Sequence, residues 1–198
     1  MGAPSYRAAP KAALFTLAAS SLAAPAMAAE TSTINAADTA WMIVATALVL
    51  MMTIPGLALF YSGMVRKKNV LATMAQSLAA VALISILWVS FGYSLAFVGD
   101  GPWIGTLDRW FLVGMTMESV NPAAKTIPEA LFMLYQMTFA IITVALVAGS
   151  VADRMRFSAY LLFAMGWFVF VYVPLAHWVW GGGFLNTMGV LDFAGGLV

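Results

Sequence analysis

Two stretches near the end of the sequence carry residue types suited to holding a small cation. Residues 176–183 read Ala-His-Trp-Val-Trp-Gly-Gly-Gly, and residues 191–196 read Leu-Asp-Phe-Ala-Gly-Gly. The indole face of Trp180 could attract a cation, and the three glycines allow a turn with positive φ. A second interpretation stays open, in which Trp178 and Trp180 form an interfacial aromatic belt and the glycines only a turn.

Asp192 and His177 are the two remaining polar side chains of these stretches. A carboxylate at the mouth of an apolar segment costs a few kcal/mol unless it is satisfied, so Asp192 is a functional candidate. It could equally cap a helix that begins there, and the two roles are compatible. We expect His177, one turn before Trp180, to be a hydrogen-bonded residue at a helix end and not a ligand.

The composition predicts a membrane protein. The chain is 63% hydrophobic and only 9% charged, whereas a soluble domain carries about 25% charged residues. A net charge of +1 argues against nucleic acid as a partner. The absence of cysteine and the single histidine exclude disulfides, iron–sulfur clusters and multi-histidine metal sites built from this chain alone. No nucleophile–base pair, phosphate loop or cofactor motif indicates an enzyme.

Residues 1–28 have the pattern of a secretory signal peptide. Arg7 and Lys11 precede an apolar core at 12–24 that is too short to span a bilayer, and residues 26–28 fit the small-x-small cleavage rule. Cleavage would leave residues 29–40 as a periplasmic N-terminus. This places the chain in a bacterial inner membrane.

The rest of the chain predicts an all-α, polytopic membrane protein. Apolar spans are expected at about 41–64, 70–98, 127–151 and 157–180, with a fifth beginning at 191–198. Pro55 should kink the first span, and the small residues Ala58 and Ser62, four apart, should allow close helix packing.

Charged residues at the span ends predict the orientation. The short loops at 65–69 and 152–156 contain five cations, namely Arg66, Lys67, Lys68, Arg154 and Arg156. The long polar stretch at 99–126 balances its cations with acids. The positive-inside rule therefore puts the short loops in the cytoplasm, which agrees with a periplasmic N-terminus.

The third span offers a possible pathway lining. One helical face carries Phe132, Tyr135, Phe139, Ile142 and Leu146. Tyr135 and Phe139 would stack on successive turns, either as packing or as a gate. Gln136 and Thr143 share a second face, where we expect hydrogen bonds between helices.

Several stretches together resemble one known family. They are residues 53–63, 68–70, 87–89, 92–97, 156–158, 176–183 and 191–196, reading TIPGLALFYSG, KNV, LWV, GYSLAF, RFS, AHWVWGGG and LDFAGG. The chain after the signal peptide resembles the N-terminal half of ammonium transporters of the Amt/Mep/Rh family. The last stretch is similar to the start of the family signature.

The resemblance implies a homotrimer with one pore per subunit. Each subunit would have eleven spans, the first ten forming two inverted five-helix repeats. Trp180 matches the tryptophan that recruits ammonium at the outer vestibule, and Phe139 matches the first of two gating phenylalanines. Tyr135 falls where relatives carry another outer aromatic, and Asp192 matches the signature aspartate. Ammonium or methylammonium is the implied substrate, crossing as neutral ammonia with or without a separate proton.

The resemblance also implies that important parts lie beyond Val198. The paired pore histidines, the second gating phenylalanine and the vestibule serine of relatives all come later in their sequences. We therefore expect residues 1–198 to be a fragment that conducts nothing by itself. Two other classes stay open: a membrane ammonium sensor and a structural subunit of a membrane complex. A P-II-type nitrogen-signal protein is an implied partner at the loops 65–69 and 152–156.

Overall fold

The computed structural model describes residues 34–196, which form helices and loops without any strand. The expected signal peptide at 1–28 lies outside the described residues. The described helices, in chain order, are α1 (Ala36–Met51), η1 (Met52–Leu57), α2 (Ala58–Met64), η2 (Lys67–Asn69), α3 (Val70–Leu87), η3 (Trp88–Gly92), α4 (Tyr93–Phe97), η4 (Trp110–Leu112), α5 (Glu129–Val151), α6 (Phe157–Trp167), η5 (Phe168–Tyr172), α7 (Val173–Val179) and α8 (Phe184–Thr187).

Within residues 34–196, four helical segments are long and apolar enough to cross a membrane. They are Ala36–Met64, Lys67–Phe97, Glu129–Val151 and Phe157–Thr187. The first begins earlier than the sequence pattern indicated, because Asn35 caps it by accepting hydrogen bonds from the Ala37 and Asp38 amides. The all-helical, membrane-spanning class predicted from the sequence is therefore confirmed.

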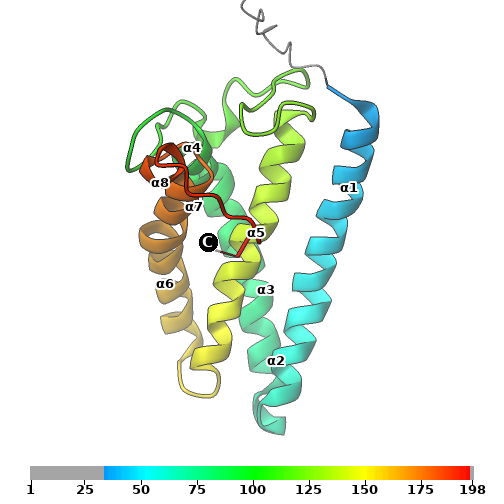
Figure 1. Cartoon of the computed structure of the whole chain (residues 1–198). Helices are drawn as coiled ribbons and strands as arrows, with labels where there is room; N and C mark the ends of the chain where they lie inside the picture. The colour runs from blue at the N-terminus through cyan, green and yellow to red at the C-terminus, as the bar shows by residue number, and fades with distance from the viewer. Residues whose placement is uncertain (1–33, 197–198) are drawn as a thin grey trace, which may run out of the picture. The chain divides into compact units, whose positions relative to one another are not determined.

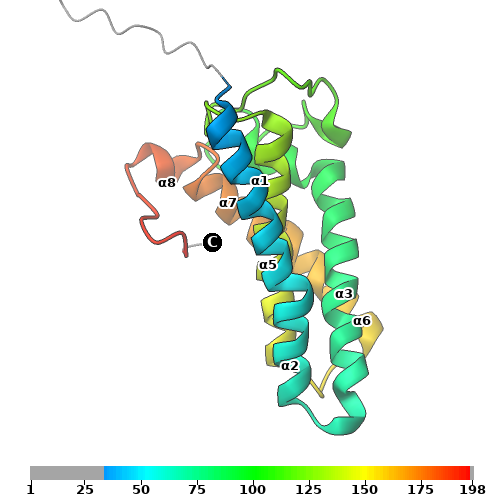
Figure 2. The same ribbon diagram turned by 90° about the vertical axis from the view of Figure 1, so that its right-hand side faces the viewer.

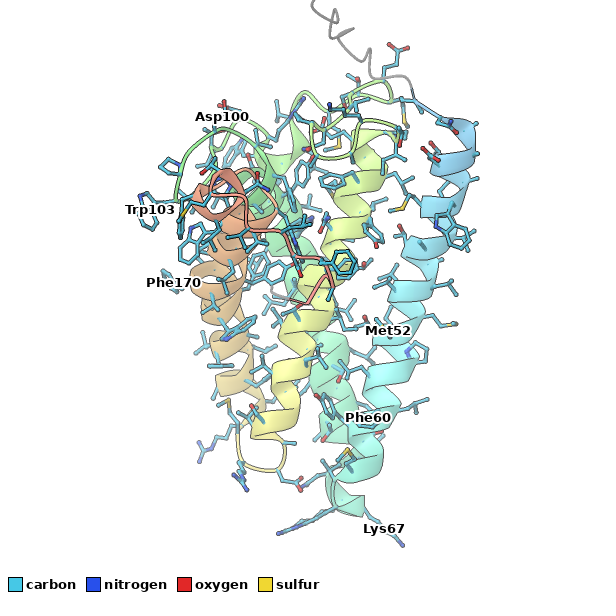
Figure 3. All side chains as sticks on the ribbon, viewed as in Figure 1. Met52, Phe60, Lys67, Asp100, Trp103 and Phe170 are labelled. Atoms are coloured by element: carbon cyan, nitrogen blue, oxygen red, sulfur yellow. The ribbon has the colours of Figure 1, made fainter. Side chains whose placement is uncertain are left out.

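The segments run side by side, with α3 and α5 between α1/α2 and α6/α7 (Figure 1). The turned view shows α3 to one side of the pair formed by α1 and α5 (Figure 2). The loop at 98–128 covers one end of this bundle, and the two basic loops lie at the other (Figure 1). Lys67 and Asp100 mark these opposite ends (Figure 3). Asn69 donates to Asp153 and so ties the two basic loops together.

Three of the four segments contain a π-helical turn. Pro55 lies inside the first π-helical turn, Met52–Leu57. Proline has no backbone N–H group, and the helix accommodates this loss in one widened turn. The second and third, Trp88–Gly92 and Phe168–Tyr172, meet each other. A Cβ atom on Gly92 would lie 2.6 Å from Cζ of Phe168, so only glycine fits this contact.

Aromatic side chains fill the core between the second, third and fourth segments. Trp88 is fully buried and donates from Nε1 to the Met133 carbonyl oxygen of α5 at 3.1 Å. Its ring makes edge contacts with Phe168 and Tyr172, whose own rings stack at an interplanar angle of 14°. This cluster holds α5 against the widened turns, and α5 carries one wall of the site described below.

Phe168 and Phe170 provide a matched pair for testing this core. Phe168 is fully buried, whereas Phe170, on the same turn, is 80% exposed and points away from the bundle (Figure 3). Phe168→Ala should destabilise the protein by about 3–5 kcal/mol through the cavity that it leaves. Phe170→Ala should have little effect. Thermal unfolding of the two purified variants in detergent measures the difference, and equal midpoints would contradict this description of the core.

Candidate functional site

A cavity of about 730 Å³ lies at the end of the bundle that carries the long loop. Its walls come from the ends of α4 and α7, the first two turns of α5, the loop and the segment after α8. Trp180 and Asp192 both line it, so the structure brings together the two stretches that the sequence singled out. The segment after α8 returns across the bundle to reach the cavity (Figure 1).

Trp180 reaches the cavity because α7 ends beside it. The helix stops at Val179, and the amides of Gly181 and Gly183 bond back to the carbonyl oxygen of His177 at 3.1 and 3.0 Å. Gly182 has a φ of 90°, which favours glycine. A Cβ atom on Gly181 would overlap the Ala96 carbonyl oxygen at the end of α4. The glycines therefore allow α4 and α7 to meet behind the indole.

Trp178 has a different position from Trp180. Its Nε1 donates to the Trp103 carbonyl oxygen at 2.7 Å, and its ring contacts Trp103 and Phe184. Trp103 is 63% exposed and projects outward (Figure 3). The aromatic-belt interpretation thus fits Trp178 and its neighbours, whereas Trp180 lines the cavity.

Asp192 is hydrogen-bonded to Trp180 across the cavity wall. Trp180 Nε1 donates to Asp192 Oδ2 at 3.2 Å, and the Gly196 amide donates to Oδ1 at 3.1 Å. The expected helix does not begin at residue 191, because residues 191–196 have no helical turn in the structure. Two glycines in a six-residue segment oppose helix nucleation. In this structure Asp192 orients the indole and does not cap a helix.

His177 is fully buried and fastens the loop to the end of α7. Its ring nitrogens lie 3.0 Å from the Ala96 carbonyl oxygen and 2.6 Å from the Gly101 carbonyl oxygen. The Phe184 amide adds a bond to the Pro102 carbonyl oxygen at 2.9 Å. The expectation of a hydrogen-bonded residue at a helix end is confirmed for His177.

A buried polar network supports the opposite wall. Glu129, at the start of α5, is only 3% exposed; its Oε1 accepts from the Tyr93 hydroxyl at 3.0 Å, and its Oε2 lies 3.3 Å from Arg109 Nη2. Asn121 donates to the same Tyr93 hydroxyl at 3.0 Å and to the Phe97 carbonyl oxygen. The ion pair joins the loop to α5, and the helix N-terminus adds favourable charge beside the carboxylate.

Sequence reasoning did not identify Glu129 as a site residue, although a signal for it exists. Glu129 is the only acid within the third apolar segment, directly after Pro128. An acid in the first turn of an apolar helix indicates a capping or functional role. Asn121 and Tyr93 had no such signal, because their contact depends on how the loop folds back over α4.

Tyr135 and Phe139 lie on the side of α5 that carries Phe132, and neither of them lines the main cavity. Their ring centroids are 5.0 Å apart at an angle of 71°, an edge-to-face pair. Tyr135 lines a second pocket of about 350 Å³ together with Trp41 and Phe132. Phe132 lines both pockets, so its side chain is shared by their walls. Phe139 is partly buried one turn beyond Tyr135.

The sequence predicted hydrogen bonds from Gln136 and Thr143 to other helices. Among the described residues this prediction is wrong. Thr143 Oγ1 donates to the Phe139 carbonyl oxygen of its own helix at 2.7 Å. Gln136 lines the main cavity, and its Oε1 is buried without a hydrogen bond to any residue of 34–196. Helical spacing placed these residues on a face but could not identify what lies opposite.

Gly181→Ala tests the close contact that positions Trp180. The new methyl group would collide with the Ala96 carbonyl oxygen, so α4 and α7 must separate. We expect a loss of about 1–3 kcal/mol or more, as for overpacked cores. Gly63→Ala is the matched control, because a Cβ atom added there would meet no atom within 4 Å and alanine favours a helix. Chemical or thermal unfolding in detergent would contradict this account if both variants lost equal stability.

Comparison with known proteins identifies the family. Residues 40–198 match the family model described as Ammonium Transporter Family. The chain is 51% identical over 168 residues to a putative ammonium transporter of Methanothermobacter thermautotrophicus, and 51% identical over 161 residues to an ammonium transporter of Bacillus subtilis. These matches cover 83% and 81% of this chain but only 40% and 39% of the relatives.

Solved structures agree with the sequence matches. The crystal structure of Candida albicans Mep2 superposes with a TM-score of 0.72 at 37% identity, over 84% of this chain and 36% of that chain. Saccharomyces cerevisiae Mep2 gives a TM-score of 0.73 at 35% identity, over 83% of this chain and 37% of that chain. The chain thus spans about 40% of the length of curated relatives, and it belongs to the ammonium transporter family.

Proposed function

We propose that this chain forms part of a transmembrane ammonium transporter, and that its main cavity is the vestibule where ammonium is gathered. The observation that carries the proposal is the cavity wall shared by Trp180 and Asp192 at one end of a four-span bundle. An indole face and a nearby carboxylate are suited to a small cation. Membership of the ammonium transporter family supports ammonium as that cation.

The charges around the cavity favour a cation. Its lining includes three carboxylates, from Asp100, Glu129 and Asp192, and one guanidinium, from Arg109. A cleft with excess negative charge and apolar walls concentrates cations at its mouth. Arg109 is paired with Glu129, and the lining as a whole contains more carboxylates than guanidinium groups.

Transport past the vestibule requires ammonium to lose a proton. A bare ion in a dry channel faces a Born cost of order tens of kcal/mol, and each aromatic contact returns only about 0.5–2 kcal/mol. Ammonium therefore gives up its proton to water at the cavity, and neutral ammonia passes through an apolar path in which Phe139, with Tyr135 beside it, forms the gate. On the cytoplasmic side ammonia takes a proton from water and becomes ammonium again. A potassium ion has no proton to give up, which supplies selectivity that size cannot.

The orientation follows from the distribution of charge. We place the basic loops in the cytoplasm and the cavity at the periplasmic face of a bacterial inner membrane. The separation of Lys67 and Asp100 at opposite ends of the bundle supports this placement (Figure 3). In the complete protein we expect a homotrimer, and a P-II-type protein is a candidate partner for the basic loops. The protein would act without a cofactor and not as an enzyme.

Trp180→Ala, in the complete reading frame that contains this chain, tests the vestibule. Loss of one cation–π contact of about 0.5–2 kcal/mol should raise the half-saturation concentration for methylammonium uptake about 2- to 30-fold. Trp110→Ala is the control, because Trp110 is 55% exposed and does not line the cavity. Uptake of labelled methylammonium into cells, normalised to transporter in the membrane, gives the result.

The same assay separates the alternative functions. Phe139→Ala should change the uptake rate if this side chain forms the gate. Normal uptake in both Trp180→Ala and Phe139→Ala would leave these residues as packing groups and remove them from the transport path. An absence of uptake by the unmodified protein, together with ammonium-dependent signalling, would instead favour a membrane sensor.

A further inference from the structure

We propose that the side-chain amide of Gln136 is a further substrate-binding group, which accepts a hydrogen bond from ammonium in the main cavity and sets preference among ammonium compounds. The inference rests on the proposed function of this cavity. It adds a neutral acceptor beside the indole of Trp180 and the carboxylates of the cavity.

The position of Gln136 follows from the helical spacing of α5. Glu129, Phe132 and Gln136 occupy one face over two turns, and all three line the main cavity. Gln136 is the innermost of the three along α5, and it directly follows Tyr135 in sequence. A cation that enters past Glu129 therefore meets Gln136 before it reaches the level of Phe139.

The amide oxygen has no partner within the described part of the chain. Gln136 Oε1 is buried without a hydrogen bond to any residue of 34–196. A buried amide oxygen normally accepts at least one hydrogen bond, and an unsatisfied one calls for a partner such as a water molecule, an ion or a ligand. Because Gln136 lines the main cavity, rotation of its side-chain amide can present this oxygen to a molecule bound there.

The chemistry of the amide fits ammonium. The terminal torsion of glutamine is broad and nearly two-fold, so rotation exchanges the oxygen and the nitrogen at small cost. With its oxygen turned toward the cavity, Gln136 accepts an N–H group. Asp192 already accepts from Trp180 and from the Gly196 amide. A neutral acceptor also holds the cation less firmly than a second carboxylate, which suits a site that must release its ligand.

Gln136→Met in the complete reading frame tests the proposal, because methionine keeps the length but removes the acceptor. We expect the half-saturation concentration for methylammonium uptake to rise about tenfold, equivalent to about 1.4 kcal/mol, with the maximal rate per transporter nearly unchanged. Gln136→Glu restores an acceptor and should return the half-saturation concentration to the wild-type value or below. Ammonium should also lose potency as a competitor against methylammonium in Gln136→Met.

Gln76 provides the matched control. It is 6% exposed, its Oε1 is also buried without a hydrogen bond to the described residues, and it lies on α3 away from the cavity lining. Gln76→Met should leave the half-saturation concentration unchanged. An equal rise in both methionine variants would assign the effect to loss of a buried amide and overturn the proposal.

The remaining outcomes are distinguishable. If the unmodified protein takes up no methylammonium, the proposed function fails. If it takes up methylammonium and Gln136→Met has the wild-type half-saturation concentration, the function stands and the role of Gln136 is overturned. Should Gln136→Met not reach the membrane, Gln136→Asn replaces it: the shortened amide should give the same rise, and no rise would overturn the inference.

Discussion

The cavity and its walls depend on hydrogen bonds to the backbone carbonyl groups where α4 ends inside the bundle. A broken helix end in an apolar environment is stable only when its free groups find partners. The Leu95 and Val98 carbonyl oxygens accept from the amides of Gly105 and Thr106, each at 2.8 Å. The Ala96 carbonyl oxygen lies against His177 of α7. These bonds fold the loop back over α4 and close one side of the cavity.

The same contacts explain why the cavity can hold charged residues beside an apolar core. Arg109 is placed by its own amide, which donates to Ser94 Oγ at 3.0 Å, and Ser94 in turn donates to the Thr106 carbonyl oxygen. The guanidinium then reaches Glu129 on α5. Removing one partner of such a pair leaves a buried charge, which costs more than the pair contributes. The loop, α4 and α5 are therefore coupled through one polar network.

Packing and chemistry are divided between the two sides of α5. Buried residues such as Ala140, Ile141 and Val144 fix the helix against its neighbours. The cavity face, by contrast, carries Glu129 and Gln136. A rigid helix thus presents polar groups at defined depths, and under the proposed function a cation entering the cavity would meet a charged group first and a neutral one next. Gating by the Tyr135–Phe139 pair would follow along the same helix.

The sequence by itself determined the all-helical membrane class and indicated the four apolar spans, because apolar run length is a local property. From residue chemistry alone it singled out Trp180 and Asp192 as candidates. It also identified the glycines, and the structure supplied their reason, the approach of Gly181 to the Ala96 carbonyl oxygen. Only the tertiary structure decided that Trp178 contacts Trp103 while Trp180 lines the cavity, and that the Gln136 amide oxygen lacks a partner among the described residues. These depend on contacts between residues far apart in the chain, which helical periodicity cannot specify.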